Sequence, residues 1–290
     1  MTLDWERVGR VSPAALVEAR ETAHHAAQLL ALVGASYIPT RADDSHTSMT
    51  WLDGAQALTT EIVDTSRPFR VGLRISDLTL LFLDATLREA GVFPLVERTR
   101  NEAIAWLRAR IGDAGRDGTT MHTSLHFSIA PHATDSGAPF VRHVDALDEL
   151  ARWYADAHVI LEARREHTRG AGEVRCWPHH FDIATLVACS SGPFQTIGIG
   201  MSPGDSRYRE PYLYVGPYPR PTSDVAALEI GHWHTTDWFG AVLTASEIVA
   251  RDSASEQLTL VNRFVDGALD SLASRSGLPG HAPSVSSGEP

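Results

Sequence analysis

Three apolar segments decide the fold: Phe181-Asp-Ile-Ala-Thr-Leu-Val-Ala-Cys189, Phe194-Gln-Thr-Ile-Gly-Ile-Gly-Met201 and Tyr212-Leu-Tyr-Val215. Each is rich in β-branched or aromatic residues, has the length of a strand and is followed at once by glycine, proline or serine. Strands that follow one another through such short connections pair antiparallel. We therefore expect an antiparallel sheet over this part of the chain.

Working outward, the same signals predict further strands at 173–177, 228–235 and 239–243, and, upstream, at 47–52, 57–63, 69–76 and 78–84. Residues 120–130 alternate, which predicts one more strand with a buried and a polar face. Its apolar face would carry Thr123, Leu125, Phe127 and Ile129, and its polar face His122, Ser124, His126 and Ser128.

Helices are predicted between Ser12 and Gly34, at 99–111, at 144–166 and from Ser253 to about 274, with a short one after Thr244. Runs of strands flanked by helices indicate an α+β fold with largely antiparallel sheets, packed helices and a long C-terminal helix. We expect an N-terminal α+β half at 1–118, a strand-rich C-terminal α+β half at 119–275 and a disordered tail at 276–290.

Composition narrows the chemistry. All 25 basic residues are arginine, which excludes Schiff-base lysines, and with them standard pyridoxal phosphate enzymes, as well as P-loop lysines. The two cysteines are too few for a cluster or a cysteine-rich zinc site. A net charge of −11 argues against nucleic acid as a partner. The absence of a long apolar run or a signal-peptide pattern predicts no membrane contact and a cytoplasmic location.

One motif that suggests serine catalysis fails on chemical grounds. The segment Gly200-Met-Ser-Pro-Gly204 fits the nucleophile-elbow pattern G-x-S-x-G. The oxyanion hole of that motif needs the backbone N–H of the residue after serine, and Pro203 has none. We interpret the segment as a turn between strands.

The densest polar cluster is Trp177-Pro-His-His180-Phe-Asp182. In an extended strand His180 and Asp182 share a face, where the carboxylate would orient the imidazole and raise its basicity. The alternative is a hydrogen-bonded pair that anchors a strand end. Arg175, two residues before Trp177, is a candidate for binding an anionic group of a substrate.

A second cluster, Gly231-His232-Trp-His234, has the H-x-H spacing that places two imidazoles on one side of a strand. Together with His122 and His126, or with His180 and Asp182, it would bind a divalent metal, if tertiary structure brings the strands together. The alternative is a polar sheet face with histidines that bind nothing. No cofactor is otherwise required by the sequence.

Glu210 precedes an aromatic strand that carries Tyr212 and Tyr214, and Asp205 lies in the loop before it. Glu210 is either a buried acid or base or a cap on a turn, and the tyrosines suit the lining of a cavity. His24 and Gln28 lie four apart on the first helix and share a face, while His46 lies in a loop. By themselves these three residues are expected at the surface.

The order of these motifs resembles a family of bacterial proteins known only as a domain of unknown function. Members carry a helical His and Gln four apart, a Leu-Thr-Thr strand, Trp-x-x-Phe-Asp-Leu-Ala, Trp-Pro-Gly-Asp and Gly-Glu-Pro-x-Phe-Tyr-x-Tyr. The matching pieces here, between about 20 and 272, are His24 with Gln28, His46, 57–60, 177–184, 202–205 and 210–214. The chain departs from the pattern at Pro178-His179-His180 and at His232 and His234. The resemblance implies that His24, His46, Asp182, Asp205 and Glu210 converge, and it implies no reaction.

The sequence therefore predicts an enzyme that acts on a small polar molecule by acid–base chemistry, such as elimination, proton transfer or hydrolysis. Its candidate catalytic residues are His180, Asp182, Glu210 and His46, and its candidate substrate-binding residues are Trp177, Arg175, Tyr212, Tyr214, His24, Gln28 and Asp205. His232 and His234 would bind the metal of a metal-assisted variant. The alternative is a protein that binds a small molecule in the same pocket without turnover.

Overall fold

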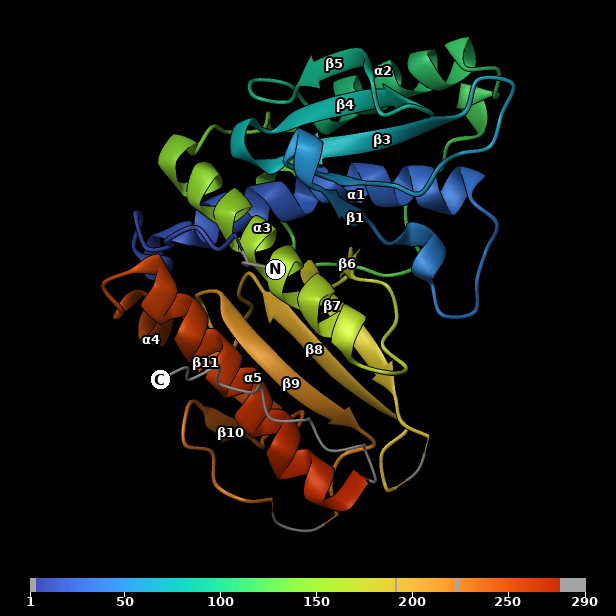
Figure 1. The fold of residues 1–290 in the computed structure, drawn as a ribbon. Coiled ribbons are helices and arrows are strands. Elements are labelled where there is room, and N and C mark those ends of the chain that lie inside the picture. The colour runs from blue at the N-terminus through green and yellow to red at the C-terminus, as the bar shows by residue number, and fades with distance from the viewer. Residues whose placement is uncertain (1–3, 191, 223–224, 277–290) are drawn as a thin grey trace, which may run out of the picture.

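The computed structural model describes residues 4–190, 192–222 and 225–276, which form two antiparallel sheets (Figure 1). The first has the strand order β1-β2-β3-β4-β5, with β1 Thr50–Leu52, β2 Ala57–Thr59, β3 Phe69–Arg74, β4 Thr79–Asp84 and β5 Glu89–Pro94. The second has the order β10-β11-β9-β8-β7-β6, with β6 Arg175–Trp177, β7 Asp182–Ala188, β8 Thr196–Ser202, β9 Tyr212–Tyr218, β10 His232–His234 and β11 Gly240–Thr244. The predicted tail after residue 276 lies outside the described residues.

Two of the helices begin at capping boxes that stand in the sequence. The main helices are α1 Val17–Tyr37, α2 Arg100–Asp113, α3 Val144–His167, the short α4 Ala245–Val249 and the C-terminal α5 Ala254–Ser276. Thr99 and Glu102 form a reciprocal capping box before α2, and Thr244 and Glu247 do so before α4. The predicted α+β class, with antiparallel sheets and a long C-terminal helix, is confirmed.

The two sheets meet edge to edge at the chain segments before β1 and within β6. Met49 N–H donates to the Cys176 carbonyl at 2.9 Å, and Cys176 N–H donates to the Met49 carbonyl at 2.7 Å. Each sheet lies within one of the two halves expected from the sequence. One continuous hydrophobic core nevertheless includes residues from both, such as Leu80 and Ile199.

The two faces of the second sheet differ in chemistry. Helices α3 and α5 lie across one face (Figure 1), and the buried Ile183, Ile199 and Leu243 point toward them. Because side chains alternate along a strand, the neighbours of these residues point to the other face. That face carries polar, aromatic and glycine residues.

The expected strand at 120–130 is wrong: no strand is assigned to these residues. Their alternation is real in burial, since Leu125 and Phe127 are partly buried while His126 is exposed. Their carbonyl groups accept hydrogen bonds from side chains and not from a neighbouring strand; Arg100, for example, donates to the Thr123 carbonyl. The pattern therefore predicted the inward side of an extended segment, but no sheet edge pairs with it.

One further strand is shorter than expected, and one, β5, was not expected. The segment expected at 228–235 is a strand only over His232–His234. Strand β5 has mostly exposed or half-buried residues and lacks the apolar alternation by which strands are found. It forms because the turn after Asp84 folds it back onto β4. Among the described residues, no helix is both long and apolar enough to cross a membrane.

Candidate functional site

A cavity of about 330 Å³ lies on the polar face of the second sheet. Seven residues line it: His180, Asp182, Ser202, Asp205, Tyr212, Tyr214 and Trp238. The volume is at the lower end of the range for small-molecule sites. Five of the seven residues were candidates from the sequence, so the cavity gathers one group of them.

The strand register places these side chains together. Ala184 pairs with Gly200 on β8, and Gly200 pairs with Tyr214 on β9. A Cβ atom at Gly200 would lie 2.6 Å from the Tyr214 hydroxyl and ring, closer than atoms can approach. Glycine at this position is what allows Tyr214 to lie flat across β8 and reach Asp182 at the start of β7.

Asp182 is the central residue of the cavity. Tyr214 donates its hydroxyl hydrogen to Asp182 Oδ2 at 2.5 Å, while the buried Oδ1 has no hydrogen-bond partner. The residue is 9% exposed. Burial raises the pKa of this carboxyl group, and the bond from Tyr214 and the nearby His180 oppose that rise. Burial also raises the pKa of Tyr214 well above its usual value, so its hydroxyl remains a donor.

Asp205 is the second carboxylate of the lining. It accepts hydrogen bonds from the backbone N–H groups of Arg207 and Tyr208 on Oδ1, and from the Tyr212 hydroxyl on Oδ2 at 2.8 Å. This turn follows Gly204, whose N–H donates to Ser202 Oγ at 3.2 Å. The predicted turn after β8 is thereby confirmed, and no helix follows Ser202.

His180 reaches the cavity from a tight turn and not from an extended strand. Phe181 N–H donates to the Trp177 carbonyl at 2.6 Å, and Phe181 adopts φ 57°. The expectation that His180 and Asp182 share a strand face is therefore wrong, because β6 ends at Trp177 and β7 begins at Asp182. The turn nevertheless brings both residues to the same cavity, with His180 exposed at its rim.

His24 and Gln28 hold this turn from α1. Gln28 Nε2 donates to the Pro178 carbonyl at 2.8 Å, and His24 Nε2 is 2.8 Å from the same oxygen. The His24 ring stacks on Phe181 with a centroid distance of 5.0 Å. Burial lowers the pKa of His24 to about 4, so the ring is neutral at pH 7 and donates from Nε2. From the helix alone these residues were expected at the surface, and that expectation is wrong. They position the turn and do not line the cavity.

The pair His232 and His234 does share one side of β10, as the spacing predicted. The Tyr208 hydroxyl lies between the rings, 2.9 Å from His232 Nε2 and 3.0 Å from His234 Nδ1. Strand β10 is four positions from β7 in the sheet, about 19 Å at the usual strand spacing. The expected ligand set with His180 and Asp182 is therefore wrong. Among the described residues, no group of three or more His, Cys, Asp or Glu side chains is placed to hold a metal ion.

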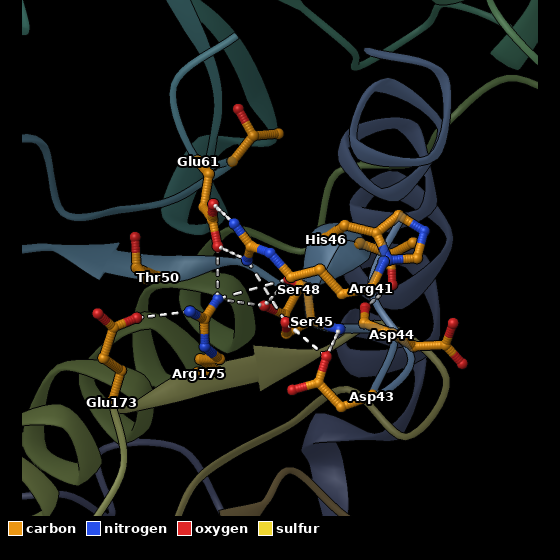
Figure 2. A network of polar contacts seen from close by, with 12 residues as sticks. Arg41, Asp43, Asp44, Ser45, His46, Ser48, Thr50, Glu61, Glu173 and Arg175 are labelled. Atoms are coloured by element: carbon orange, nitrogen blue, oxygen red, sulfur yellow. Dashed lines mark hydrogen bonds and ion pairs between the residues drawn. The ribbon is translucent and has the colours of Figure 1, made fainter. Parts of the chain in front are cut away.

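Arg175 lies in a different network, which Figure 2 shows. Its Nη1 donates to Glu61 Oε1 at 2.8 Å and to Ser48 Oγ at 2.9 Å, and its Nη2 donates to Glu173 at 2.5 Å. Arg41 binds both oxygens of Glu61, at 2.5 and 2.6 Å. Both terminal nitrogens of Arg175 therefore bond protein acceptors, and Arg175 is not among the residues that line the cavity.

The two remaining catalytic candidates also lie elsewhere. His46 is buried beneath α1, where its Nδ1 accepts from the Arg41 backbone N–H at 3.3 Å. Glu210 bonds the backbone N–H and hydroxyl of Ser246, both at 2.6 Å, in the first turn of α4. It is a cap and does not face the cavity. Trp177 is half-buried, and its ring lies 6.1 Å from the His179 ring at an angle of 65°.

Two residues of the lining were missed in the sequence, Ser202 and Trp238. Ser202 belongs to the rejected serine motif and lines the cavity as a polar wall. The Trp238 ring lies over Gly240, where a Cβ atom would be 2.5 Å from the indole. A tryptophan two residues before a strand glycine is the only local signal, and by itself it is weak.

No known protein family, curated protein or solved structure matches this chain. The geometry of the cavity therefore carries the functional conclusion by itself.

Proposed function

We propose that the cavity around Asp182 binds a small polar molecule and that Asp182 transfers a proton to or from it. The observation that supports this is the state of its carboxyl group. Asp182 lines the cavity, one of its oxygens is held by Tyr214, and the other is buried without a partner. Buried polar atoms nearly always have partners, so an unpaired one in a cavity suggests a group that a ligand completes.

The chemistry of proton transfer suits this arrangement. A carboxyl group with a raised pKa holds its proton closer to neutral pH, and it therefore serves as acid or base at small cost. Tyr214 fixes its orientation through Oδ2, which leaves Oδ1 for the ligand. His180 at the rim would exchange the proton with solvent. Elimination, isomerisation and hydrolysis all need such a group.

Binding without turnover is the second candidate, and the exposure of His180 favours it. A solvent-exposed imidazole does not exclude water from a reacting group, which many acid–base reactions need. The two candidates share the cavity and the role of Asp182 as a ligand contact. They differ in whether the bound molecule changes.

The first test asks whether Asp182 has the expected state. The midpoint of its carboxyl titration, followed by carbon-13 NMR, should lie above the value of 3.8 for a free aspartate. A midpoint at or below that value would contradict the proposal, because the carboxyl group would then be an ordinary solvated one. Asp182→Asn identifies the signal.

The second test separates catalysis from binding. Native mass spectrometry of the purified protein and of Asp182→Asn identifies the small molecules whose retention depends on Asp182. Each is then incubated with the protein in D2O and followed by NMR. Catalysis predicts deuterium incorporation or product formation that falls at least about 100-fold in Asp182→Asn and persists in Glu210→Gln, which alters a carboxylate outside the cavity. Binding alone predicts retention with no chemical change.

A further inference from the structure

The cavity has an unusual balance of charge for this chain. Two carboxyl groups line it, those of Asp182 and Asp205, and no arginine does. Over residues 4–190, 192–222 and 225–276, no ion pair is formed by either group; the donors to Asp205 are backbone N–H groups and a tyrosine hydroxyl. Of the other two buried acids among the described residues, Glu149 takes an arginine partner, Arg152 at 2.8 Å, and Asp156 takes none. The lining itself thus holds no arginine, although Arg20 Nη1 lies close behind it, 2.7 Å from where a Cβ atom of Gly204 would be.

Aromatic rings form the rest of the cavity wall. The ring centroids of Tyr212 and Tyr214 lie 6.3 Å apart, and each lies 6.4 Å from the Trp238 ring. The Tyr214 ring is inclined by 75° to Trp238, while the Tyr212 ring is inclined by 23°. Ring faces carry negative potential and attract cations, tryptophan most strongly. Three such rings and two carboxyl groups, against one imidazole, make the lining attractive to positive charge.

We infer that the ligand of this cavity carries an organic ammonium group, seated against the Tyr212, Tyr214 and Trp238 rings and paired with the carboxyl groups of Asp205 and Asp182. The unpaired Asp182 Oδ1 is an acceptor for an ammonium N–H. This inference rests on the proposed function of the cavity and names the class of its ligand.

The alternatives fit the lining less well. A carboxylate or phosphate ligand would meet two acidic groups and only one imidazole, His180. A neutral polyol would find acceptors and ring faces but would leave the charge of Asp205 without a counterion. A primary amine is favoured over a quaternary one, because only an N–H group can complete Asp182 Oδ1. The cavity of about 330 Å³ limits the ligand to a small molecule.

The experiment uses three probes of one length and shape: butylammonium, 1-butanol and butyrate. Binding to the full chain is followed through the Trp238 indole N–H signal, which Trp238→Phe identifies. Butylammonium should shift this signal saturably, with an affinity at least about fivefold above that of 1-butanol, and butyrate should not shift it. Tetramethylammonium should bind more weakly than butylammonium because it cannot donate to Asp182.

Three variants locate the bound cation. Asp205→Asn and Trp238→Leu should each weaken butylammonium binding, Trp238→Phe should weaken it less than Trp238→Leu, and Glu210→Gln should leave it unchanged. The variants are followed by ligand-observed NMR, so loss of the indole signal does not affect the measurement. Far-ultraviolet circular dichroism verifies that each variant is folded.

The inference would be overturned if 1-butanol binds as tightly as butylammonium or if butyrate binds preferentially. It would also be overturned if Asp205→Asn and Trp238→Leu leave butylammonium binding unchanged. None of these results would change the titration midpoint of Asp182, or the ligand retention that depends on Asp182, by which the proposed function is tested. Conversely, an ordinary titration of Asp182 would overturn the proposed acid–base role even if ammonium probes bind. The two failures are therefore distinguishable.

Discussion

Two polar clusters meet at strands β6 and β7, and they differ in how completely their charges are matched. In the network of Figure 2, Glu61 takes bonds from both Arg41 and Arg175. In the cavity, Asp182 takes one bond from a tyrosine and keeps an oxygen unpaired. A cluster whose polar groups all have partners holds chain segments together. A cluster in a cavity that keeps an unpaired acceptor leaves that acceptor for a ligand.

The same contrast appears in how each acid titrates. Hydrogen bonds from Arg41, opposed by partial burial and joined by those from Arg175, lower the pKa of Glu61 to about 2. Burial raises the pKa of Asp182, and the bond from Tyr214 and the nearby His180 offset only part of that rise. The pKa values of two carboxyl groups therefore shift in opposite directions, because their neighbours differ. Functional assignments should thus be based on unmatched groups in cavities and not on the density of polar residues.

The largest effect on stability that we expect comes from a third acid, Asp156 on α3. It tests whether a buried carboxyl group without a charged partner lowers the free energy of unfolding by itself. Its Oδ1 accepts from the Glu6 backbone N–H, its Oδ2 is unpaired, and burial raises its pKa to about 8. The folded state therefore binds a proton that the unfolded state has released above about pH 4. Stability falls as pH rises between these two values, by up to about 1.4 kcal/mol per pH unit.

Asp156→Asn should remove this slope. We expect the variant to gain about 2 to 3 kcal/mol on wild type between pH 5 and pH 7, measured by urea unfolding at both pH values. A constant difference between the two proteins over this range would show that Asp156 does not carry the proton.

The next largest effect should come from breaking the network of Arg41, Glu61 and Arg175. Glu61→Gln leaves Arg41 without its paired carboxylate and Arg175 with only Glu173, and it should lower the free energy of unfolding by about 2 kcal/mol at pH 7. Because the folded pKa of Glu61 lies below the unfolded value, its contribution is present above about pH 4.5 and is lost as pH falls toward 2. The difference from wild type should shrink over that window.

Glu173→Gln is the matched control for this experiment. Glu173 also bonds Arg175, but its side chain is 70% exposed, and its loss should cost at most about 1 kcal/mol. Equal losses in the two variants would mean that the network stabilises the protein through general charge and not through the two-arginine pairing of Glu61.

A smaller effect should come from disturbing the floor of the cavity. In Gly200→Ala the new methyl group collides with the Tyr214 ring and with Ala184 Cβ at 2.8 Å, which we expect to cost about 1 to 2 kcal/mol. The bond between Tyr214 and Asp182 should break as the ring moves. Gly198→Ala, whose nearest neighbour would be Leu186 at 3.5 Å, should change stability by less than about 0.5 kcal/mol. Thermal unfolding of the pair measures the contrast.

The smallest effect sharpens the state of Asp182 itself. Tyr214→Phe removes the one hydrogen bond that Asp182 receives from a side chain, and that bond lowers its pKa. The carboxyl titration should therefore move to higher pH, and stability should change by about 1 kcal/mol or less. A downward movement of the NMR midpoint would show that the Tyr214 hydroxyl is not the donor in this bond.

The sequence predicted part of the site and missed the rest for a physical reason. Asp182, Asp205, Tyr212 and Tyr214 were identified because they stand at the ends of strands that pair in chain order. Arg175 was misassigned because its partner Glu61 is 114 residues away. Trp238 was missed because nothing local shows that it bends back over Gly240.

The sequence by itself determined the α+β class, the antiparallel pairing of consecutive strands and the exclusion of lysine chemistry. Alternation, capping and composition are local properties, so they can be read without knowing the fold. The tertiary structure alone decided which polar groups are matched: it gave Glu61 two arginines, made Glu210 a cap, and left Asp182 with an unpaired oxygen. Pairing of that kind depends on contacts between distant segments, and strand register and chain closure set those contacts.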